Sequence, residues 1–320
     1  HEVLDSASYI NGKAVTNFSQ HLGDYLNIKH VIPCANGTDA LQIAMMALDL
    51  KPGDEVITPS FTYIATTEVV ALLGLTPVFV DVDPITFCMD VNSLKKAITP
   101  KTKAIIVVHW GGYPVDLDRL KEIQNKAEQL YGFKPAVIED GAHSFGSEYK
   151  GKKLGNHGNM IMYSLQAIKH VTAIDGGLLV LPHQDLYNRA KLIRWYGIDR
   201  DGNRKDFRCE ADITEWGFKF HMNDVCATVG IENLKCAEDI IGKHRSNAKF
   251  YDDNLKNVKG VTLLDRNPNH NSAFWIYSML VENRDGFYKH MKDCGIVVSQ
   301  VHERNDKHTC VKDYKSFLPN

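Results

Sequence analysis

The chain lacks an excess of charge of either sign, because 37 lysines and arginines are balanced by 39 aspartates and glutamates, a formal net charge of −2 at pH 7. Without a basic field or a polybasic run, nothing in the composition favours nucleic acid or a membrane surface. The sequence also lacks an apolar run that could span a bilayer and a signal-peptide pattern at its start. We therefore expect no nucleic-acid partner, no membrane partner and a cytoplasmic location.

Cysteine is scarce as well. The seven residues of this type are odd in number, they are scattered along the chain, and none forms a C-x-x-C pair. Such a set favours reduced thiols over a disulfide framework and has no zinc-ligand spacing, so we expect no metal. Also missing is a G-x-G-x-x-G after the first predicted strand, which argues against a nicotinamide dehydrogenase.

What the chain does have is a regular alternation of short apolar runs with amphipathic segments. This alternation predicts an α/β fold with a mainly parallel sheet flanked by helices on both faces. In such sheets, ligands bind at the carboxyl ends of the strands. The predicted strands are 30–35, 55–58, 76–82, 103–109 and 135–140, and the predicted helices are 15–27, 40–50, 63–73, 91–98 and 117–130.

The second half of the chain has a different pattern. Beyond about residue 235 the alternation is lost, so we predict a large domain, residues 1–235, and a smaller α+β C-terminal domain, residues 236–320. The chain begins at His1 rather than Met and stops without a closing element, so we expect truncated ends and an incomplete small domain. The predicted helices are 186–196, 222–235, 237–258 and 284–294, the predicted strands are 261–264, 273–281 and 296–301, and 199–214 has the composition of an exposed loop.

Candidate site residues follow the predicted strands. The first strand leads into the turn N-G-T-D at 36–39, where Gly37 allows a tight turn and Thr38 or Asp39 can cap the next helix. Two interpretations are open: a well-capped helix without further role, or a helix start whose N–H groups and Thr38 hydroxyl bind a phosphate. Ser60, His109, Asp140 and Ser164 stand at other predicted strand ends.

Lys169 lies among the apolar neighbours Leu165, Ala167 and Ile168. Desolvation disfavours the charged form of a lysine and lowers its pKa, which makes the amine a better nucleophile. Most lysines have no chemical role, and a lone carboxylate such as Asp140 can equally be a helix cap or part of a structural ion pair. Together, however, a reactive amine, a buried carboxylate and a phosphate-binding helix start are what pyridoxal phosphate requires.

Five motifs extend this interpretation over the chain: C-A-N-G-T-D-A-L (34–41), P-G-D-E-V-I-T-P-S-F-T-Y (52–63), P-V-F-V-D-V-D-P (77–84), I-E-D-G-A-H-S-F-G (138–146) and S-L-Q-A-I-K-H (164–170). In this order and spacing they resemble the DegT/DnrJ/EryC1/StrS family of sugar aminotransferases, which are pyridoxal 5′-phosphate (PLP) enzymes of fold-type I in the aspartate aminotransferase superfamily. The resemblance covers nearly all of the sequence.

The resemblance implies a catalytic role for three residues. Lys169 resembles the lysine that binds the cofactor covalently and later moves a proton as a neutral amine. Asp140 resembles the partner of the pyridinium nitrogen, and His143 stands where the family has Gln or His near the phenolic oxygen of the cofactor. The remaining cofactor-binding residues implied by the resemblance are Gly37, Thr38, Asp39 and Ser164 around the phosphate and Tyr63 stacked on the pyridine ring.

The resemblance also implies a homodimer with shared active sites. In G-F-K-F-H-M-N-D (217–224), Lys219 replaces an Asn that in many relatives reaches the cofactor phosphate of the neighbouring subunit, and His221 replaces a frequent Arg. Lys219 could make that contact as a cation. His302, in V-S-Q-V-H-E-R (298–304), corresponds to a segment of the substrate pocket, and His109 is a second candidate for contact with the sugar; both could instead be structural.

The sequence thus predicts transfer of an amino group from glutamate to a nucleotide-linked keto sugar, for polysaccharide or glycoside biosynthesis. C4 of a 4-keto-6-deoxy hexose is preferred because this substrate class is frequent in the family, and C3 is possible. The nucleotide is left open. Two alternatives remain, a PLP-dependent sugar dehydratase of the same family and a catalytically silent regulatory relative. Dehydratases of the family have His in place of the lysine, so the presence of Lys169 favours transamination.

Overall fold

The computed structural model describes residues 1–10, 12–200, 202, 212–314 and 316–318. Within these ranges, eight strands form one sheet in the order β1-β9-β8-β5-β4-β2-β3-β13. All neighbours are parallel except β9, which runs antiparallel to both β1 and β8. The predicted mainly parallel sheet is confirmed. Its strands are β1 (Val31–Cys34), β2 (Glu55–Pro59), β3 (Thr76–Val80), β4 (Thr102–Val108), β5 (Ala136–Asp140), β8 (Met160–Ser164), β9 (Gly177–Val180) and β13 (Ser316–Phe317).

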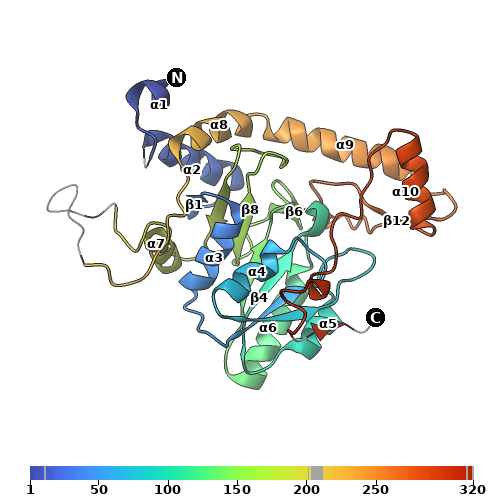
Figure 1. The fold of residues 1–320 in the computed structure, drawn as a ribbon, viewed down its shortest axis with the longest axis horizontal. Helices are drawn as coiled ribbons and strands as arrows, with labels where there is room; N and C mark the ends of the chain where they lie inside the picture. The colour runs from blue at the N-terminus through green and yellow to red at the C-terminus, as the bar shows by residue number, and fades with distance from the viewer. Residues whose placement is uncertain (11, 201, 203–211, 315, 319–320) are drawn as a thin grey trace.

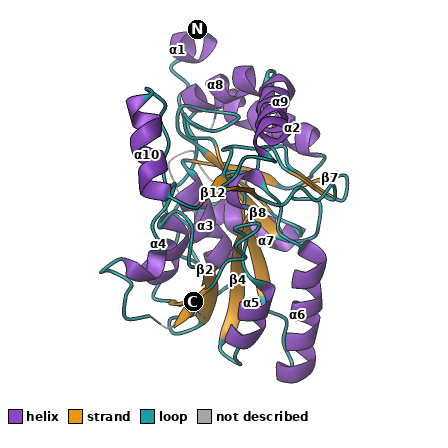
Figure 2. Cartoon of the chain, turned by 90° about the vertical axis from the view of Figure 1, so that its right-hand side faces the viewer, coloured by secondary structure: helices purple, strands orange, loops and turns teal. Residues whose placement is uncertain are grey.

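Helices cover both faces of the sheet (Figure 2). Alternate residues of a strand point to opposite faces, so Ile105 and Val107 of β4 enter one hydrophobic cluster while Ala104 and Ile106 enter the other. All four side chains are fully buried, and each larger one stabilises the fold by about 1.5–3 kcal/mol. The first cluster is covered by α2 (Lys13–Leu26), α5 (Val91–Ala97), α6 (Leu117–Tyr131), α8 (Asp224–Leu234) and α9 (Ala237–Leu255), and the second by α3 (Gly37–Ala47), α4 (Ala65–Leu72) and α7 (Gln184–Ile193).

Helix α2 starts without a cap of its own. Its first residue follows Gly12, which has no side chain, and the carboxylate of Asp224 replaces the missing cap. One oxygen of Asp224 accepts from the N–H of Gly12 at 2.8 Å, and the other accepts from the N–H groups of Ala14 and Val15 at 3.0 and 3.2 Å. Asp224 is the first residue of α8, so this contact joins the N-terminal helix to a segment more than two hundred residues away.

The smaller part of the molecule lies beyond α8. It contains the long α9, a two-stranded sheet of β10 (Val261–Leu263) and β12 (Met279–Val281), and α10 (Arg284–Asp293), with the short α1 (Glu2–Ser6) at the opposite end of the molecule (Figure 1). A three-stranded sheet is formed by β11 (His270–Asn271), β6 (Glu148–Tyr149) and β7 (Lys152–Lys153).

Two strand predictions were wrong in this part. Of residues 273–281 only 279–281 form a strand, because the preceding residues follow an irregular path that includes Phe274 at φ 50°. Residues 296–301 form no strand: none of their backbone groups joins a ladder with β10 or β12. The chain then returns to the large sheet, where β13 pairs with β3 and the N–H of Asn305 donates to the Ser60 carbonyl. The domain division at residue 235 stays a prediction.

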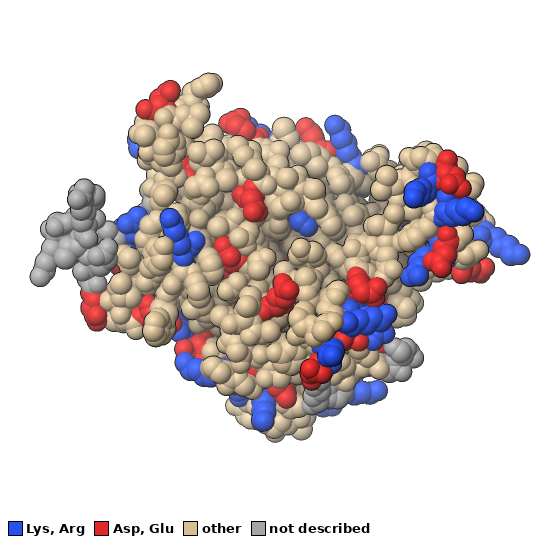
Figure 3. All heavy atoms as spheres, viewed as in Figure 1, with Lys and Arg blue, Asp and Glu red and all other residues tan. Residues whose placement is uncertain are grey.

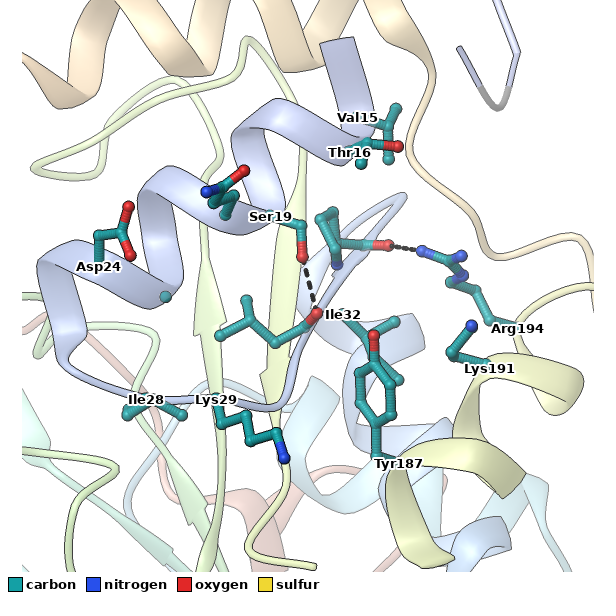
Figure 4. Close-up of a pocket in the computed structure, with 14 residues that line it drawn as sticks. Val15, Thr16, Ser19, Asp24, Ile28, Lys29, Ile32, Tyr187, Lys191 and Arg194 are labelled. Atoms are coloured by element: carbon teal, nitrogen blue, oxygen red, sulfur yellow. Dashed lines mark hydrogen bonds between the residues drawn. The ribbon is translucent and has the colours of Figure 1, made fainter. Parts of the chain in front are cut away.

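The free edge of β1 borders a cavity of about 570 Å³ between α2 and α7 (Figure 4). Ser19 donates to the Val31 carbonyl at 2.9 Å and Arg194 donates to the Pro33 carbonyl at 2.9 Å, while Pro33 has no N–H to offer. Because its outward carbonyls are engaged, this edge is a poor template for pairing with another strand. The cavity contains neither Lys169 nor Asp140 in its lining.

The described surface carries both signs of charge. Figure 3 shows basic and acidic side chains mixed over the visible face, most densely toward the α10 end. The mixture agrees with the balanced composition. No described helix has the combination of length and apolar composition needed to cross a membrane.

Candidate active site

The sheet brings the ends of three strands together. Strand β8 lies between β5 and β9, and β9 is followed by β1, so Asp140, Ser164 and the start of α3 lie along one edge of the sheet. Lys169 stands in the turn that follows β8. This arrangement places side chains that are far apart in sequence where ligands bind in open α/β sheets.

Asp140 is a buried carboxylate with two donors. The residue is only 5% exposed. Its Oδ2 accepts a hydrogen bond from the Thr66 hydroxyl at 2.8 Å, and its Oδ1 accepts one from the N–H of Ala142 at 3.1 Å. Burial raises the pKa of Asp140, and the two donors and the nearby charge of Lys169 oppose this effect only in part. A carboxylate in this state gains from a cationic partner.

Lys169 is close to an aromatic ring rather than surrounded by its chain neighbours. Its Nζ lies 3.9 Å from the ring centroid of Trp275, whereas Ile168 is 66% exposed and Ala167 is also exposed. Burial lowers the pKa of Lys169 to about 8, although Asp140 acts in the opposite direction. The predicted desolvation is present, but the predicted source was wrong for Ala167 and Ile168: the turn directs both outward, and Trp275 contacts the amine instead.

His143 is held neutral beside this lysine. Its Nδ1 accepts from the N–H of Gly111 at 3.3 Å, which leaves the proton of the neutral ring on Nε2. The ring stacks on Trp275 with centroids 4.0 Å apart and planes 12° apart. Burial, and then the charge of Lys169, hold the pKa of His143 well below its usual value. His143 is therefore a hydrogen-bond donor rather than a cation at neutral pH.

His302 completes this aromatic group, which we call the Trp275 stack and define as Trp275, His143 and His302. The ring of His302 lies nearly parallel to that of His143, with centroids 5.9 Å apart. Burial lowers the pKa of His302 to about 4, and its Nε2 is buried with no partner in the structure. A buried nitrogen without a partner is unfavourable unless a ligand completes it. Tyr63, 63% exposed, lies 6.1 Å from His302 between ring centroids.

The start of α3 is packed tightly against the sheet. The predicted cap was wrong: Asn36, not Thr38 or Asp39, caps the helix by accepting from the N–H of Asp39 at 2.8 Å, so the helix already begins at Gly37. An added Cβ on Gly177 of β9 would lie 2.3 Å from the Asn36 carbonyl oxygen, and one on Gly37 would lie 3.3 Å from Cβ of Ser164. The absence of a side chain on these two glycines allows this approach, which brings Ser164 against the start of an eleven-residue helix. Such a place suits a phosphate.

Thr38 and Asp39 are half-buried at this helix start. Burial raises the pKa of Asp39 to about 6, and the nearby Asp175 acts in the same direction, while Asn36 opposes it. A phosphate here would add negative charge beside Asp39. The groups that fit a phosphate are therefore the helix N–H groups and the hydroxyls of Thr38 and Ser164. The carboxylate of Asp39 lies next to this place but has no proton to donate to a phosphate.

Two predicted residues are not part of this cluster. His109 is fully buried, with Nε2 2.8 Å from Glu139 and Nδ1 accepting from the N–H of Val115 at 3.1 Å, so both ring nitrogens are engaged within the protein. Lys219 is exposed and its backbone forms a bridge with Trp195. The neighbouring Phe220 carbonyl accepts from the N–H of Ala35, which places this segment beside the end of β1.

The structure adds one residue and one contact that sequence reasoning missed. Thr66 lies inside a predicted helix, and no local signal indicates that its hydroxyl reaches Asp140. Gly111 contacts His143 only because the loop after β4 turns back at two positive-φ glycines, Gly111 and Gly112. The neighbouring glycines at 111–112 are the one sequence signal that could have drawn attention to this loop. Among the described residues, no group of three or more His, Cys, Asp or Glu could hold a metal ion.

Comparison with known proteins identifies relatives of this chain among sugar aminotransferases. A curated relative from Pseudomonas aeruginosa, UDP-2-acetamido-2-deoxy-3-oxo-D-glucuronate aminotransferase, is 37% identical over 99% of this chain and 84% of its own length. Another from Shewanella sediminis, UDP-4-amino-4-deoxy-L-arabinose–oxoglutarate aminotransferase, is 31% identical over 92% of this chain and 77% of its own. The crystal structure of AtS13 from Actinomadura melliaura superposes with a TM-score of 0.95 at 44% identity, over 99% of this chain and 85% of AtS13.

The cofactor follows from the same comparison. Spr1654 from Streptococcus pneumoniae, which has been solved in its PLP form, is similar with a TM-score of 0.88 at 25% identity over 98% of this chain and 83% of its own. The predicted fold-type I PLP architecture is thereby confirmed. The sequence profile of DegT/DnrJ/EryC1/StrS aminotransferases matches residues 1–316. This chain belongs to the DegT/DnrJ/EryC1/StrS aminotransferase family, whose sugar aminotransferases use PLP.

Proposed function

We propose that this PLP-dependent sugar aminotransferase moves an amino group from glutamate to a nucleotide-linked keto sugar, for polysaccharide or glycoside biosynthesis in the cytoplasm. The assignment of aminotransferase activity is supported by membership of the family. The nucleotide linkage is supported by two relatives whose names specify UDP-linked sugars, and glutamate by the word oxoglutarate in one of them. Amination at C4 of a 4-keto-6-deoxy hexose is our preferred reaction, and C3 is the alternative.

The observation that carries the proposal is the meeting of Lys169 and Asp140 beside the α3 start. PLP supplies an aldehyde that binds amines and a pyridinium ring that withdraws electrons from the bound carbon. Asp140 would stay charged opposite the ring nitrogen, because a cationic partner offsets its burial. The amine of Lys169, with a pKa of about 8, is neutral in an appreciable fraction of molecules near neutral pH and can accept and return a proton.

The neighbouring residues would orient the cofactor. His143 would donate from Nε2 to the phenolic oxygen, since Gly111 already occupies Nδ1. The helix start at Gly37 with the hydroxyls of Thr38 and Ser164 would hold the phosphate, with Asp39 beside it. Tyr63 is exposed enough to lie over the ring, and His302, whose Nε2 lacks a partner, would contact the sugar. His109 would act only by holding the loop that carries Gly111.

The site is completed by a second subunit in this proposal. Lys219 would reach the phosphate bound by the partner copy, replacing as a cation the amide of other family members. Its exposed position beside the end of β1 is compatible with such a contact. The protein would then be a homodimer with two shared sites.

The test is a panel of nucleotide-linked keto sugars with the purified protein, PLP and glutamate. We expect one sugar of the panel to be aminated at C4 with stoichiometric formation of 2-oxoglutarate, as measured by product mass and the position of the amine. Lys169→Ala should abolish the product, and Lys259→Ala, at an exposed position, should not. Amination of simple keto acids alone would show that the substrate class is wrong. Loss of a sugar hydroxyl without glutamate consumption would identify a dehydratase instead.

A further inference from the structure

We propose that Trp275 is a positioning residue of the active site, which fixes the amine of Lys169 and the ring of His143 through one indole side chain. The proposal rests on the proposed function only in so far as Lys169 is the reacting amine. Trp275 is not one of the residues implied by the family motifs, and the contacts described below come from its three-dimensional environment.

Trp275 contacts the lysine segment in two ways. Its Nε1 donates to the carbonyl of Ile168 at 3.0 Å, which fixes the backbone immediately before Lys169. Its ring lies 3.9 Å from Nζ of Lys169, so the end of the side chain is fixed as well. The turn that carries Lys169 is short and exposed at Ala167 and Ile168. Within the turn, the N–H of Lys169 donates a hydrogen bond to the carbonyl of Gln166. Without the indole, the lysine would lose both contacts and gain rotamer freedom.

The indole is itself held rigidly. It follows Phe274, whose φ of 50° lies in the left-handed region, and four protein groups hold the backbone that leads to it. Ser147 Oγ accepts from the N–H of Ala273 at 3.0 Å, His170 Nε2 lies 3.0 Å from the Ala273 carbonyl, His244 Nδ1 lies 2.7 Å from the Phe274 carbonyl, and Arg245 donates to the Ser272 carbonyl at 3.0 Å. Such a number of contacts is expected where a strained residue must hold a neighbouring side chain in place.

The position of Trp275 has two opposite electrostatic consequences for the amine. The face of an indole attracts a cation, which favours the charged amine. The same ring excludes water, which favours the neutral amine. Asp140 on β5 is the acidic group that interacts with Lys169, and His143, His170 and His302 interact with it as well. Because burial outweighs Asp140 in setting the pKa of Lys169, we expect water exclusion to be the larger effect of the indole.

The cofactor-free protein tests this directly. Lys169 is labelled with trinitrobenzenesulfonate over a range of pH, and modification of its peptide is measured by mass spectrometry. In the wild type the midpoint should lie near pH 8. Trp275→Ala should move it upward by on the order of one pH unit or more, toward the ordinary value for lysine. Trp275→Phe, which keeps an aromatic face, should stay closer to the wild type.

A matched control is Phe250→Ala, because Phe250 is an aromatic residue that is 66% exposed and lies on α9, outside the site. Its midpoint should be unchanged. Circular dichroism and thermal unfolding establish that each variant is folded, and Trp275→Phe keeps the test valid if Trp275→Ala does not fold. An unchanged midpoint in a folded Trp275 variant that has lost the ring, or a Trp275→Phe midpoint as high as that of a solvated lysine, would overturn the proposal.

The loaded enzyme gives a second readout. Trp275→Ala should slow the half-reaction with glutamate about 10- to 100-fold while the KM for the sugar changes little, since a misplaced amine affects the chemical step. A rise in the KM for the sugar alone would show that Trp275 is only a wall of the sugar pocket and would contradict its positioning role. If the labelling midpoint shifts in Trp275→Ala but the wild-type protein aminates no sugar, the role of Trp275 is supported and the proposed function is refuted. If the protein aminates a sugar but the midpoint does not shift, the proposed function is supported and the role of Trp275 is refuted.

Discussion

At the scale of single residues, burial disfavours the charged forms of both Lys169 and Asp140, which are the forms that predominate in water at neutral pH. Burial lowers the pKa of the lysine and raises the pKa of the carboxyl group. A protein that buries such groups loses stability by an amount that increases with each pKa shift. These two residues therefore resemble other active-site groups whose environment serves chemistry at the expense of stability.

Lys169→Met should stabilise the cofactor-free protein at pH 7 by about 1–3 kcal/mol. The folded pKa of Lys169, about 8, is below the ordinary 10.5, so the charged amine is disfavoured in the folded state. The cost is complete below pH 8 and is relieved as the pH rises from 8 to 10.5. Urea unfolding at pH 7 and pH 10 measures the difference, with Lys259→Met as an exposed control. A variant less stable than the wild type at pH 7 would contradict this explanation.

Thr66→Val should weaken PLP binding by about 10-fold, because the carboxylate of Asp140 loses a charged hydrogen bond. Binding is measured from the absorbance of the bound cofactor. Thr58→Val is the matched control: the Thr58 hydroxyl is buried with no partner in the structure, so its removal should leave PLP affinity unchanged and should not destabilise the fold. Equal losses of affinity in both variants would show that Thr66 has no specific role.

At the scale of elements, the starts of two helices depend on residues that are distant in sequence. Helix α3 approaches β8 and β9 closely only because Gly37 and Gly177 have no side chains. Helix α2 depends on Asp224 from the start of α8. In both cases periodicity predicts the helix but places its start two or three residues too late, and its exact position is decided by a second element.

Gly177→Ala should displace the start of α3 and weaken PLP binding by at least about 10-fold. An added Cβ would lie 2.3 Å from the Asn36 carbonyl oxygen and 2.6 Å from the Gly37 nitrogen, which are backbone atoms that cannot rotate away. We expect a loss of about 2–4 kcal/mol in unfolding free energy. Gly242→Ala in α9 is the control, because no atom lies within 4 Å of the added Cβ, and it should stabilise by about 1 kcal/mol. Retained affinity in Gly177→Ala would refute the role given to this contact.

Asp224→Asn should destabilise the protein by about 1–3 kcal/mol, as measured by urea unfolding. The asparagine side chain has one oxygen that can still accept a hydrogen bond. Its NH₂ group replaces the second carboxylate oxygen and would face backbone N–H groups, which are donors as well, so those hydrogen bonds are lost. Asp239→Asn is a suitable control because this exposed residue lies in the first turn of another helix, where the change should cost less than about 1 kcal/mol. Equal effects in the two variants would exclude the capping explanation.

At the scale of the whole molecule, large apolar side chains are exposed around the candidate site. Tyr63 is 63% exposed, Ile168 66% and Ile174 56%, and all three belong to segments that carry or adjoin residues of the proposed cofactor site. Trp216 and Phe218 flank the segment of Lys219 and are also exposed. Exposed apolar side chains that gather around a site favour an interface, and a second copy is the partner that the proposed shared site requires.

A hybrid experiment tests this sharing. Lys169→Ala and Lys219→Ala proteins, each weakly active or inactive alone, are unfolded, mixed in equal amounts and refolded. If Lys219 acts across the interface, each mixed dimer holds one complete site, and about a quarter of the wild-type activity should return. If Lys219 acts within its own subunit, the mixed dimer has a site lacking Lys169 and a site lacking Lys219, and no activity beyond the average of the parents should appear.

The sequence by itself determined the alternation of strands and helices up to β5, the mainly parallel character of the sheet and the family. Strand and helix periodicities are local, and the motifs around Asp140 and Lys169 are contiguous, so both can be read without coordinates. The roles assigned to Lys169, Asp140 and the α3 start stay predictions, although the structure brings these groups to one edge of the sheet. The loop assigned to 199–214 lies mostly outside the described residues.

Only the tertiary structure decided what surrounds each of these groups. Two of the apolar sequence neighbours of Lys169, Ala167 and Ile168, point outward, and the ring against its amine comes from Trp275. His109 stands at the end of a strand, as Asp140 does, but its side chain turns into the core toward Glu139. Residues 296–301 have strand-like composition but no ladder partner. Burial, hydrogen bonding and strand pairing depend on contacts between distant segments, and these contacts set the pKa of Lys169 and the tautomer of His143.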